Sequence, residues 1–397
     1  MITAQDQPTG IDDSNADAGR IRQLVRDARR LVIKVGSSSL ADAQAGLNHQ
    51  RIKQLVDALA KRHLAGSDII LVSSGAIAAG LEPLGLTHRP SDIAQQQAAA
   101  AVGQGRLIWA YSQAFGEHGC FVAQILLTRD DLSRQNSYSA AWQTIGALTR
   151  LGAIPIVNEN DTVATAEIKL GDNDHLAALV AELVRADALL LLSDVDGLYT
   201  TNPTHPDAAR IDLVELNTPL GIDVSQSGSS GVGSGGMATK VKAARLAARS
   251  GVPVVLGRWD QAQAILDGQV CGTVFEASEK RLRRHLGWVA HASTISGQIF
   301  VDAGAAAALR QGNASLLAAG IRRVEGDFAR DDSVLVVDPS GLGIARGQVA
   351  YAASELPAML GRTSADLADQ LGADFARPVI HRDDLVLNRR GGATEAR

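Results

Sequence analysis

Two clusters of short carboxylate and amide side chains lie about twelve residues apart near the middle of this 397-residue chain, at 158–161 and 172–174. Side chains this short have little use in a hydrophobic core, because an unpaired buried carboxylate costs several kcal/mol or more. Asp161, Asp172 and Asp174 could instead hold a small charged substrate. Each cluster alone is also compatible with an Asx-rich turn, and the second could cap a helix that starts near Asn173.

Three short apolar runs predict β-strands, and each run ends in a turn of small polar residues. A strand that leads into a glycine turn exposes backbone N–H groups, and such groups bind phosphate oxygens. These turns therefore predict a phosphate-binding edge. The runs and their turn residues are 31–35 with Gly36 and Ser37, 69–72 with Ser73, Ser74 and Gly75, and 188–192 with Ser193 and Asp194.

Lysine is rare in this chain, which has seven lysines and 31 arginines. Lys34, Lys169 and Lys240 nevertheless all lie beside glycine turns, and Lys240 ends the glycine-rich loop 231–240. A compact ammonium group suits a phosphoryl group that moves during a reaction, whereas the arginine fork imposes a fixed geometry. The loop also has the spacing of a dinucleotide fingerprint, but no strand precedes it, and the sequence has no P-loop motif. The lysines therefore indicate phosphate chemistry of another type.

The alternation of strand and helix patterns predicts an α/β fold. Strand patterns occur near residues 31, 69, 121, 153, 188 and 253, with helical patterns between them. This order is typical of a mainly parallel open sheet with helices on both faces, where ligands bind at the carboxyl ends of the strands. Beyond Gly297 the texture changes to short strands separated by Gly and Asp turns. The expected organisation is a disordered N-terminal tail at 1–28, an α/β domain at 29–275, a linker at 276–296, a β-rich domain at 297–380 and a C-terminal tail at 381–397.

The composition restricts the class of protein. A net charge of −5 favours neither a membrane surface nor nucleic acid as a partner. The two cysteines, Cys120 and Cys271, are far apart and lack metal-site spacing, which indicates free buried thiols in a reducing compartment. No apolar run reaches transmembrane length, and residues 1–30 lack a signal-peptide core. We therefore expect a cytoplasmic protein.

The motifs of the chain, taken in order, resemble those of the amino acid kinase family and, within it, the glutamate 5-kinases, from about Leu31 to Leu387. Aspartokinases, acetylglutamate kinases and uridylate kinases share the strand-glycine scheme but not the Asn-Glu-Asn-Asp block. Residues 297–380 resemble the PUA module, a small β-barrel-like fold that glutamate 5-kinases often carry at the C-terminus. The motifs are Val-Ile-Lys-Val-Gly-Ser-Ser, Val-Ser-Ser-Gly-Ala-Ile-Ala-Ala-Gly, Ala-Val-Gly-Gln, Leu-Leu-Thr-Arg, Val-Asn-Glu-Asn-Asp, Glu-Ile-Lys-Leu-Gly-Asp-Asn-Asp and Gly-Ser-Gly-Gly-Met-Ala-Thr-Lys.

The resemblance implies transfer of the ATP γ-phosphoryl group to the side-chain carboxylate of L-glutamate, the first step of proline biosynthesis. It assigns Lys34 and Lys240 to the phosphoryl oxygens and Asp174 to holding these lysines in place. Mg²⁺ would accompany ATP without a direct protein ligand. The implied glutamate-binding residues are Ser74, Asp161, Asp172 and Asn173. The implied ATP-binding residues are Lys34, Gly36, Ser37, Ser193, Asp194, Ser234, Gly235, Gly236, Met237, Ala238, Thr239 and Lys240.

Further partners follow from the same resemblance, namely proline as a feedback inhibitor and a second copy of the chain in a homo-oligomer. Two alternatives stay open: another carboxylate kinase of the family, and an RNA-binding protein, because PUA modules elsewhere bind RNA. Charge argues against RNA, since residues 297–376 hold six arginines, no lysine and ten acidic residues, a net charge of −4. Most nucleic-acid affinity comes from neutralising phosphates, and this segment has little positive charge for that purpose.

Overall fold

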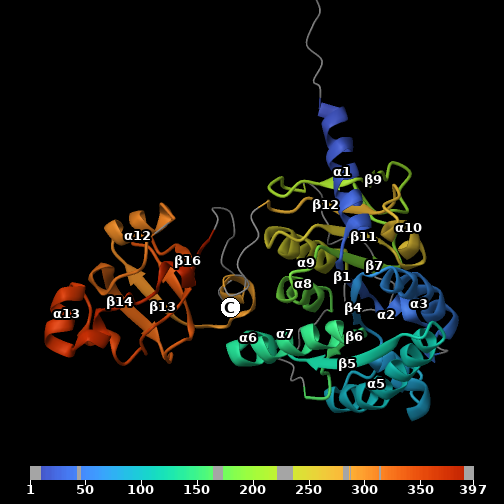
Figure 1. The fold of residues 1–397 in the computed structure, drawn as a ribbon, viewed down its shortest axis with the longest axis horizontal. Helices are drawn as coiled ribbons and strands as arrows, with labels where there is room; N and C mark the ends of the chain where they lie inside the picture. The colour runs from blue at the N-terminus through green and yellow to red at the C-terminus, as the bar shows by residue number, and fades with distance from the viewer. Residues whose placement is uncertain are drawn as a thin grey trace, which may run out of the picture. The chain divides into compact units, whose positions relative to one another are not determined.

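The computed structural model describes residues 10–42, 46–163, 173–220, 236–279, 286, 288–312 and 314–388. The chain forms two compact units (Figure 1). The first comprises residues up to Arg281 apart from Ser133–Gln135, and the second comprises those three residues and the chain from Leu282 onward.

The first unit is built on an eight-stranded sheet with the strand order β10-β12-β11-β7-β1-β4-β6-β5 (Figure 1). All neighbouring strands are parallel except β11 and β12. The prediction of a mainly parallel sheet is confirmed, and a strand lies at each of the six predicted positions. The strands are β1 Arg30–Val35, β4 Asp68–Ser73, β5 Phe121–Leu127, β6 Ala153–Glu159, β7 Ala188–Ser193, β10 Leu213–Val214, β11 Val254–Arg258 and β12 Thr273–Phe275.

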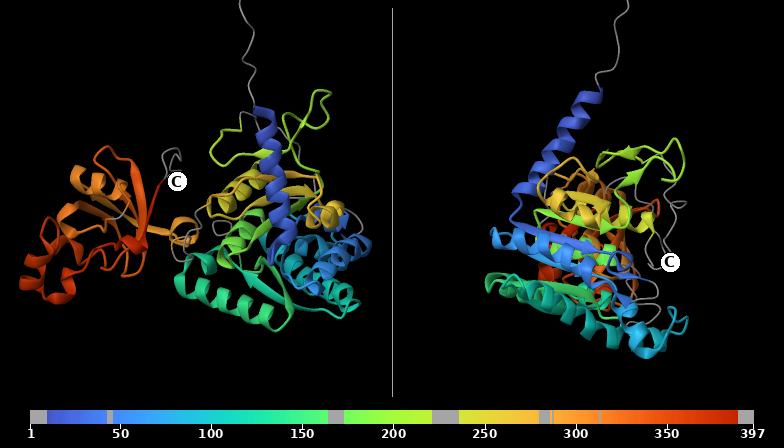
Figure 2. Two further views of the ribbon diagram at one scale, coloured as in Figure 1. Left: turned by 45° about the horizontal axis from the view of Figure 1, so that its top comes forward. Right: turned by 90° about the vertical axis from the view of Figure 1, so that its right-hand side faces the viewer.

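Helices cover both faces of this sheet, as Figures 1 and 2 show. Consecutive residues of β7 are all buried, which is typical of a parallel strand with helices on both sides. On one face, α1, α3, α5 and α10 share a hydrophobic core with Leu31, Ile33 and Val35 of β1. On the other face, α8 and α9 contact β1, β7 and β11. The helices are α1 Gly10–Asp27, α2 Ser37–Leu40, α3 His49–Leu64, α4 Ala76–Leu81, α5 Ile93–Gly116, α6 Arg129–Ser133, α7 Gln135–Arg150, α8 Asn173–Leu183, α9 Met237–Arg249 and α10 Ala262–Leu266, and two short hairpins pair β2 Ala41–Asp42 with β3 Gly46–Leu47 and β8 Leu198–Tyr199 with β9 Arg210–Ile211.

The N-terminal region corrects the prediction of a disordered tail at 1–28, because residues 10–27 form helix α1. Ala18, Ile21 and Val25 follow one another at helical spacing and are at most 3% exposed, so this face packs into the core. Between them, Arg22 donates two hydrogen bonds to Asp212, at 3.2 and 2.5 Å. The first turns of α1 stand clear of the unit in Figure 2.

The second unit contains a five-stranded sheet with the order β14-β13-β15-β16-β17, in which only β13 and β15 are parallel neighbours. Four of these strands were predicted. The fifth, β17, pairs with β16, so the prediction of a C-terminal tail from residue 381 is wrong at 385–387. The main elements are β13 Ile295–Val301, α12 Ala303–Arg310, β14 Ile321–Gly326, β15 Ser333–Val337, β16 Gly343–Gln348, α13 Ser364–Leu371 and β17 Leu385–Leu387.

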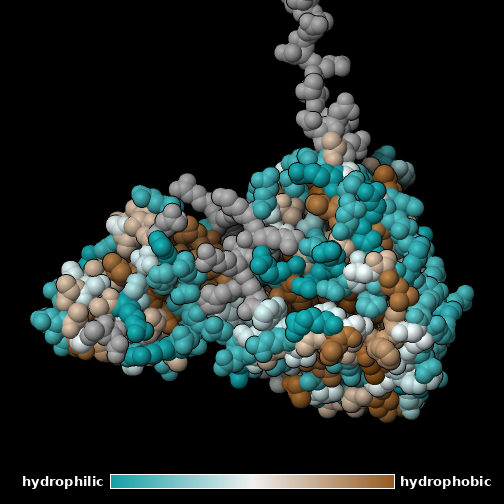
Figure 3. All heavy atoms as spheres, viewed as in Figure 1, coloured by the Kyte–Doolittle hydropathy of each residue, from teal (hydrophilic) through white to brown (hydrophobic). Residues whose placement is uncertain are grey.

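The surface of the first unit carries exposed apolar side chains on α5. No helix in the described ranges is both long and apolar enough to cross a membrane. Ile93, Val102 and Trp109 of α5 are exposed, with Trp109 at 59%. Apolar spheres gather at the lower margin of the first unit in Figure 3, where Figure 1 places α5. Both cysteines, Cys120 and Cys271, are buried free thiols.

Candidate active site

Four strands that carry the sequence motifs are neighbours in the centre of the sheet, in the order β7-β1-β4-β6. Because these strands are parallel, their carboxyl ends lie at one edge. This edge brings together Ser193 on β7, Lys34 near the end of β1, Ser73 on β4 and Asn158 on β6. The edge is also where ligands bind in open α/β sheets.

The centre of the site is a carboxylate shared by two lysines. The Nζ atom of Lys34 lies 2.5 Å from one carboxylate oxygen of Asp174, and the Nζ atom of Lys240 lies 3.2 Å from the other. The Asp174 side chain is fully buried, while the lysine side chains are 4% and 10% exposed. Two ammonium groups and one carboxylate leave one net positive charge. A site of this kind stabilises the extra negative charge of a phosphoryl group better than water does.

Three elements position this ion triad. Lys34 comes from β1, Asp174 is the second residue of α8, and Lys240 lies in the first turn of α9. Thr239, also in that turn, donates to the Gly236 carbonyl oxygen at 2.8 Å and lies 3.5 Å from Asp174 Oδ2. The packing of α8 against α9 therefore holds the Asp174 carboxylate next to Lys240, and β1 supplies Lys34.

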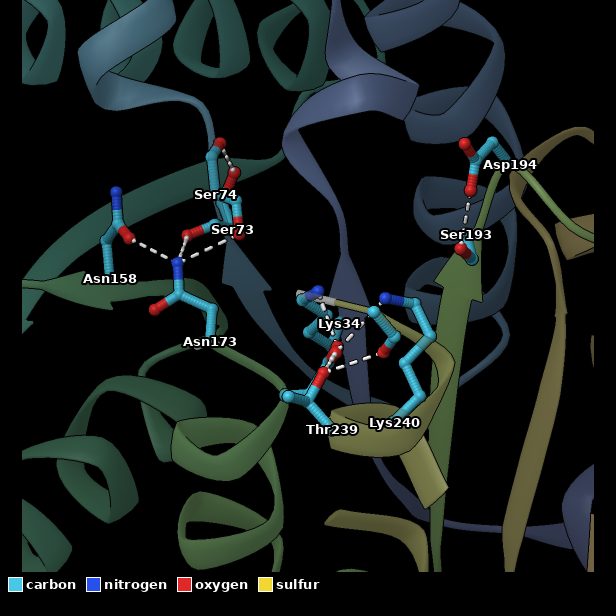
Figure 4. Close-up of polar contacts among 11 residues, drawn as sticks. Lys34, Ser73, Ser74, Asn158, Asn173, Ser193, Asp194, Thr239 and Lys240 are labelled. Atoms are coloured by element: carbon cyan, nitrogen blue, oxygen red, sulfur yellow. Dashed lines mark hydrogen bonds and ion pairs between the residues drawn. The ribbon is translucent and has the colours of Figure 1, made fainter. Parts of the chain in front are cut away.

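A second cluster, which we call the amide cluster, comprises Ser73, Ser74, Asn158 and Asn173. The Asn173 Nδ2 group lies 3.0 Å from the Ser73 carbonyl oxygen, 2.9 Å from Ser74 Oγ and 2.9 Å from Asn158 Oδ1. Figure 4 shows this cluster beside Lys34, Thr239 and Lys240. The two groups are joined in the chain, because Asn173 directly precedes Asp174 at the start of α8.

The amide cluster retains hydrogen-bonding capacity. Asn158 is only 3% exposed, and its Oδ1 atom also accepts from the Glu159 amide at 2.9 Å. Its Nδ2 group, like the Oδ1 atom of Asn173, is buried without a hydrogen-bond partner among the residues that the structure describes. Buried polar atoms of native proteins are nearly always paired, so an unpaired donor and an unpaired acceptor in the same cluster indicate a place for a polar ligand.

The other predicted nucleotide-binding residues that the structure describes lie at the ends of β1 and β7 and at the start of α9. Ser193 is buried and donates to Asp194 Oδ1 at 2.9 Å, as Figure 4 shows. Gly36 donates its N–H group to the Leu192 carbonyl oxygen, so this amide is already used by the sheet. Ser37 begins α2 directly after it. Gly236 precedes α9, whose first residues are Met237 and Ala238.

The structure thus brings most of the predicted site residues together. Asp161 lies in the turn that follows β6, three residues after Asn158. Asp172, Ser234 and Gly235 lie outside the described residues. Sequence reasoning placed Ser73 only in a phosphate-binding turn and gave Asn158 no individual role, although both belong to quoted motifs. The usable signal was a polar residue directly at the end of an apolar strand.

One further buried carboxyl lies on α8 but outside the site. Glu182, near the other end of this helix, accepts a hydrogen bond from Ser250 Oγ at 2.8 Å. Burial is the main cause that raises the pKa of Glu182 to about 7, and the hydrogen bond from Ser250 opposes the shift. This carboxyl group therefore titrates near neutral pH.

Comparison with known proteins agrees with this geometry. Residues 29–258 match the amino acid kinase family, and residues 297–371 match the PUA domain. A glutamate 5-kinase from Streptomyces coelicolor is 52% identical over 367 residues, which cover 92% of this chain and 98% of that protein. A glutamate 5-kinase from Thermobifida fusca is 50% identical over 381 residues, which cover 95% of this chain and 98% of that protein.

Proposed function

Because the chain belongs to the amino acid kinase family, and within it to the glutamate 5-kinases, we propose that it phosphorylates the γ-carboxylate of L-glutamate with ATP. The product is L-glutamate 5-phosphate, and the reaction is the first step of proline biosynthesis. The observation that carries this proposal is the adjacency of Asn173 and Asp174. Asn173 belongs to the neutral amide cluster, which suits an amino acid. Asp174 holds two lysines, which suit a phosphoryl group.

The chemistry needs alignment and charge more than it needs a base. A carboxylate is already ionised at neutral pH, so no group has to remove a proton from the nucleophile. Catalysis then rests on placing the acceptor oxygen in line with the γ-phosphorus and on neutralising the transferring group. Lys34 and Lys240 supply that charge, and Asp174 fixes both ammonium groups before ATP arrives.

Glutamate occupies the side of the site formed by the ends of β4 and β6. Ser74 holds its carboxylates through the hydroxyl group, with the unpaired Asn158 Nδ2 group as a further donor. The Nδ2 group of Asn173 is already used within the cluster, so Asn173 presents its unpaired Oδ1 atom as an acceptor to the substrate ammonium group. Asp161 and Asp172 pair with the substrate ammonium group. Opposite charges at these two ends orient the side-chain carboxylate of glutamate toward the lysines.

ATP occupies the side formed by β7, the β1 turn and the start of α9. Ser37, Ser193, Asp194 and residues 234–240 surround the nucleotide, with the Gly36 amide retained by the sheet. Asp174 already pairs with both lysines, so its carboxylate is not available as a ligand for a metal ion. Mg²⁺ would therefore be brought by ATP and not by a protein carboxylate, and it would supply further positive charge at the phosphates.

The remaining features fit a metabolic enzyme. Four of the six arginines of 297–376 form ion pairs within the second unit, so little positive charge is left for RNA there. The exposed apolar residues of α5 support a homo-oligomer, because large exposed apolar patches usually mark interaction sites. Proline inhibition and a cytoplasmic location complete the proposal, as expected for the first step of an ATP-dependent biosynthesis.

A substrate panel tests the reaction directly. The purified protein is incubated with ATP, Mg²⁺ and one amino acid, and hydroxylamine converts any acyl phosphate to a hydroxamate that is measured by its colour. Glutamate should give the largest signal, while aspartate and N-acetylglutamate give little. A higher rate with either of these two would show that the protein is another carboxylate kinase of the family.

A truncation after Ala292 tests the domain bounds. The truncated chain retains the whole eight-stranded sheet and the ion triad, so a domain at 29–275 with a linker at 276–296 should stay folded and active. Circular dichroism and the hydroxamate assay give the two readouts. A compact but inactive truncation would mean that the second unit is required for catalysis.

A further inference from the structure

The motif Ala101-Val-Gly-Gln104 lies in the middle of α5, a helix that provides no side chain to the ion triad or the amide cluster. Three residues of α5 are nevertheless buried toward the ends of the substrate-binding strands, namely Gly103, Gln104 and Tyr111. Gln104 and Tyr111 are seven residues apart, so both lie on one face of the helix. This face contacts the amide cluster through the Ser73 side chain, and it contacts the backbone at the end of β6.

Tyr111 holds the end of β4. Its hydroxyl oxygen lies 2.9 Å from Ser73 Oγ, and both side chains are fully buried. The Ser73 hydroxyl donates to the Ser74 carbonyl oxygen at 3.1 Å, and since it has one proton, Tyr111 is the donor to Ser73. Burial raises the pKa of Tyr111, so the phenol keeps this proton. The Ser73 carbonyl oxygen accepts from Asn173, which completes a chain from α5 to the amide cluster.

Gln104 holds the end of β6. Its Nε2 group donates to the Glu159 carbonyl oxygen at 3.3 Å, and its Oε1 atom accepts from Gln124 of β5 at 3.2 Å. Glu159 follows Asn158 directly and precedes Asp161 by two residues. The same helix face therefore fixes both strand ends that present groups to the amino acid.

Glycine contacts keep α5 at a fixed distance from the β4 turn. A Cβ atom on Gly103 would lie 1.7 Å from the Ala76 carbonyl oxygen, and one on Gly80 would lie 1.9 Å from the Ala99 carbonyl oxygen. The backbones of α4 and α5 are thus in direct contact. Helix α4 begins directly after Gly75, which has a φ of 102°, so this contact transmits the position of α5 to Ser74.

We propose that Tyr111 and Gln104 are positioning residues for the amino-acid pocket, which set the distance between Ser74 on one strand end and Asn158 on the other. This inference rests on the proposed function, since it concerns the same pocket. Its physical basis is preorganisation: a pocket whose groups are held by buried hydrogen bonds binds its ligand without first ordering them, and a misplacement of about 1 Å can cost as much as 100-fold in rate.

Two substitutions with a matched control test the proposal. Tyr111→Phe removes only the hydroxyl group, and Gln104→Met removes both hydrogen bonds at nearly constant volume. Each substitution should raise the KM for glutamate about fivefold to twentyfold. The KM for ATP should change less than about twofold, because the ion triad is untouched. Tyr351→Phe is the control, since Tyr351 is also buried and donates to the Arg377 carbonyl oxygen in the second unit. It should leave both KM values unchanged.

The outcomes separate this inference from the proposed function. If the wild-type protein phosphorylates glutamate and both α5 variants lose only thermal stability, with unchanged KM values, these residues are structural and the inference is wrong. If the wild-type protein instead prefers another amino acid, the proposed function fails. The same KM comparison with that amino acid then decides whether α5 positions the pocket.

Discussion

Replacement of Asp174 by Asn should destabilise the protein more than removal of either lysine partner. Asn has nearly the same shape as Asp but no charge, so the substitution leaves Lys34 and Lys240 as two buried ammonium groups without their shared carboxylate. Lys34→Met has the opposite effect on the balance of charge. It leaves Asp174 and Lys240 as a neutral pair at 3.2 Å.

The separations in the triad set the magnitude. At an effective dielectric constant of about 20, the contacts of 2.5 and 3.2 Å correspond to gross attractions of about 7 and about 5 kcal/mol. Desolvation of the three charges offsets most of this, and removal of one partner from a buried pair usually costs about 3–5 kcal/mol. We expect a loss in that range for Asp174→Asn and about 1–2 kcal/mol for Lys34→Met. Because a whole domain is stable by only about 5–15 kcal/mol, the difference is easy to measure.

Urea unfolding of the two single variants and of the double variant is the assay. The double variant should be more stable than Asp174→Asn alone, because Lys34→Met removes one of the two uncompensated charges. All three variants should lose activity by about 100-fold or more, since each disturbs the charge at the transferring phosphoryl group. Equal stability of the two single variants, or a double variant weaker than Asp174→Asn, would refute the view that Asp174 is the shared counter-ion.

Three further predictions concern pH, the N-terminal helix and the amino acid. Because the pKa of Glu182 is raised from 4.5 to about 7, the folded state binds its proton more tightly than the unfolded state does. Its contribution to stability is therefore complete below about pH 4.5, and roughly 3 kcal/mol is lost as the pH rises through 7. Glu182→Gln should remove this loss, which urea unfolding at pH 5 and pH 8 measures. An unchanged pH dependence in the variant would contradict the pKa shift. Deletion of residues 1–28 should lower the melting temperature, since it removes the buried face of α1 and the Arg22–Asp212 ion pair, whereas deletion of residues 1–9 as a control should not. Asp161→Asn should raise the KM for glutamate far more than that for ATP, and equal effects on both would place Asp161 outside the glutamate pocket.

The sheet could be predicted from sequence because its central strands are buried on both faces. Residues 188–192 are all apolar, and no solvent-facing position interrupts them. By contrast, β10 and β12 have two and three residues, too few for any periodic pattern. Helix α1 was missed for another reason. Its polar composition is typical of disorder, and only the spacing of Ala18, Ile21 and Val25 indicates a buried face.

Lys34 and Lys240 could be singled out because lysine is rare in the chain and both lie beside glycine turns, whereas the family resemblance supplied Asp174 as their common partner. The hydrogen bonds that hold the strand ends of the site could not be predicted. Tyr111 and Ser73 are 38 residues apart, and Gln104 and Glu159 are 55 apart. Tyrosine and glutamine in a helix have many roles, and only the packed structure shows which backbone atoms they hold. A motif such as Ala101-Val-Gly-Gln104 therefore indicates a family without showing what the residues of the motif do.

The start of α8 explains how a site built from many elements can align two substrates. Lys34 and Lys240 come from different elements, but Asn173 and Asp174, to which the proposed function gives the placing of the amino acid and of the phosphoryl group, share one peptide unit. Successive residues of a helix point about 100° apart, so one of them reaches the amide cluster while the next reaches the lysines. The relative position of amino acid and phosphoryl group is then set by covalent geometry, which thermal motion disturbs less than packing. For the proposed reaction, which depends on alignment and not on proton transfer, such a short covalent connection between the two halves of the site would keep acceptor and donor in line.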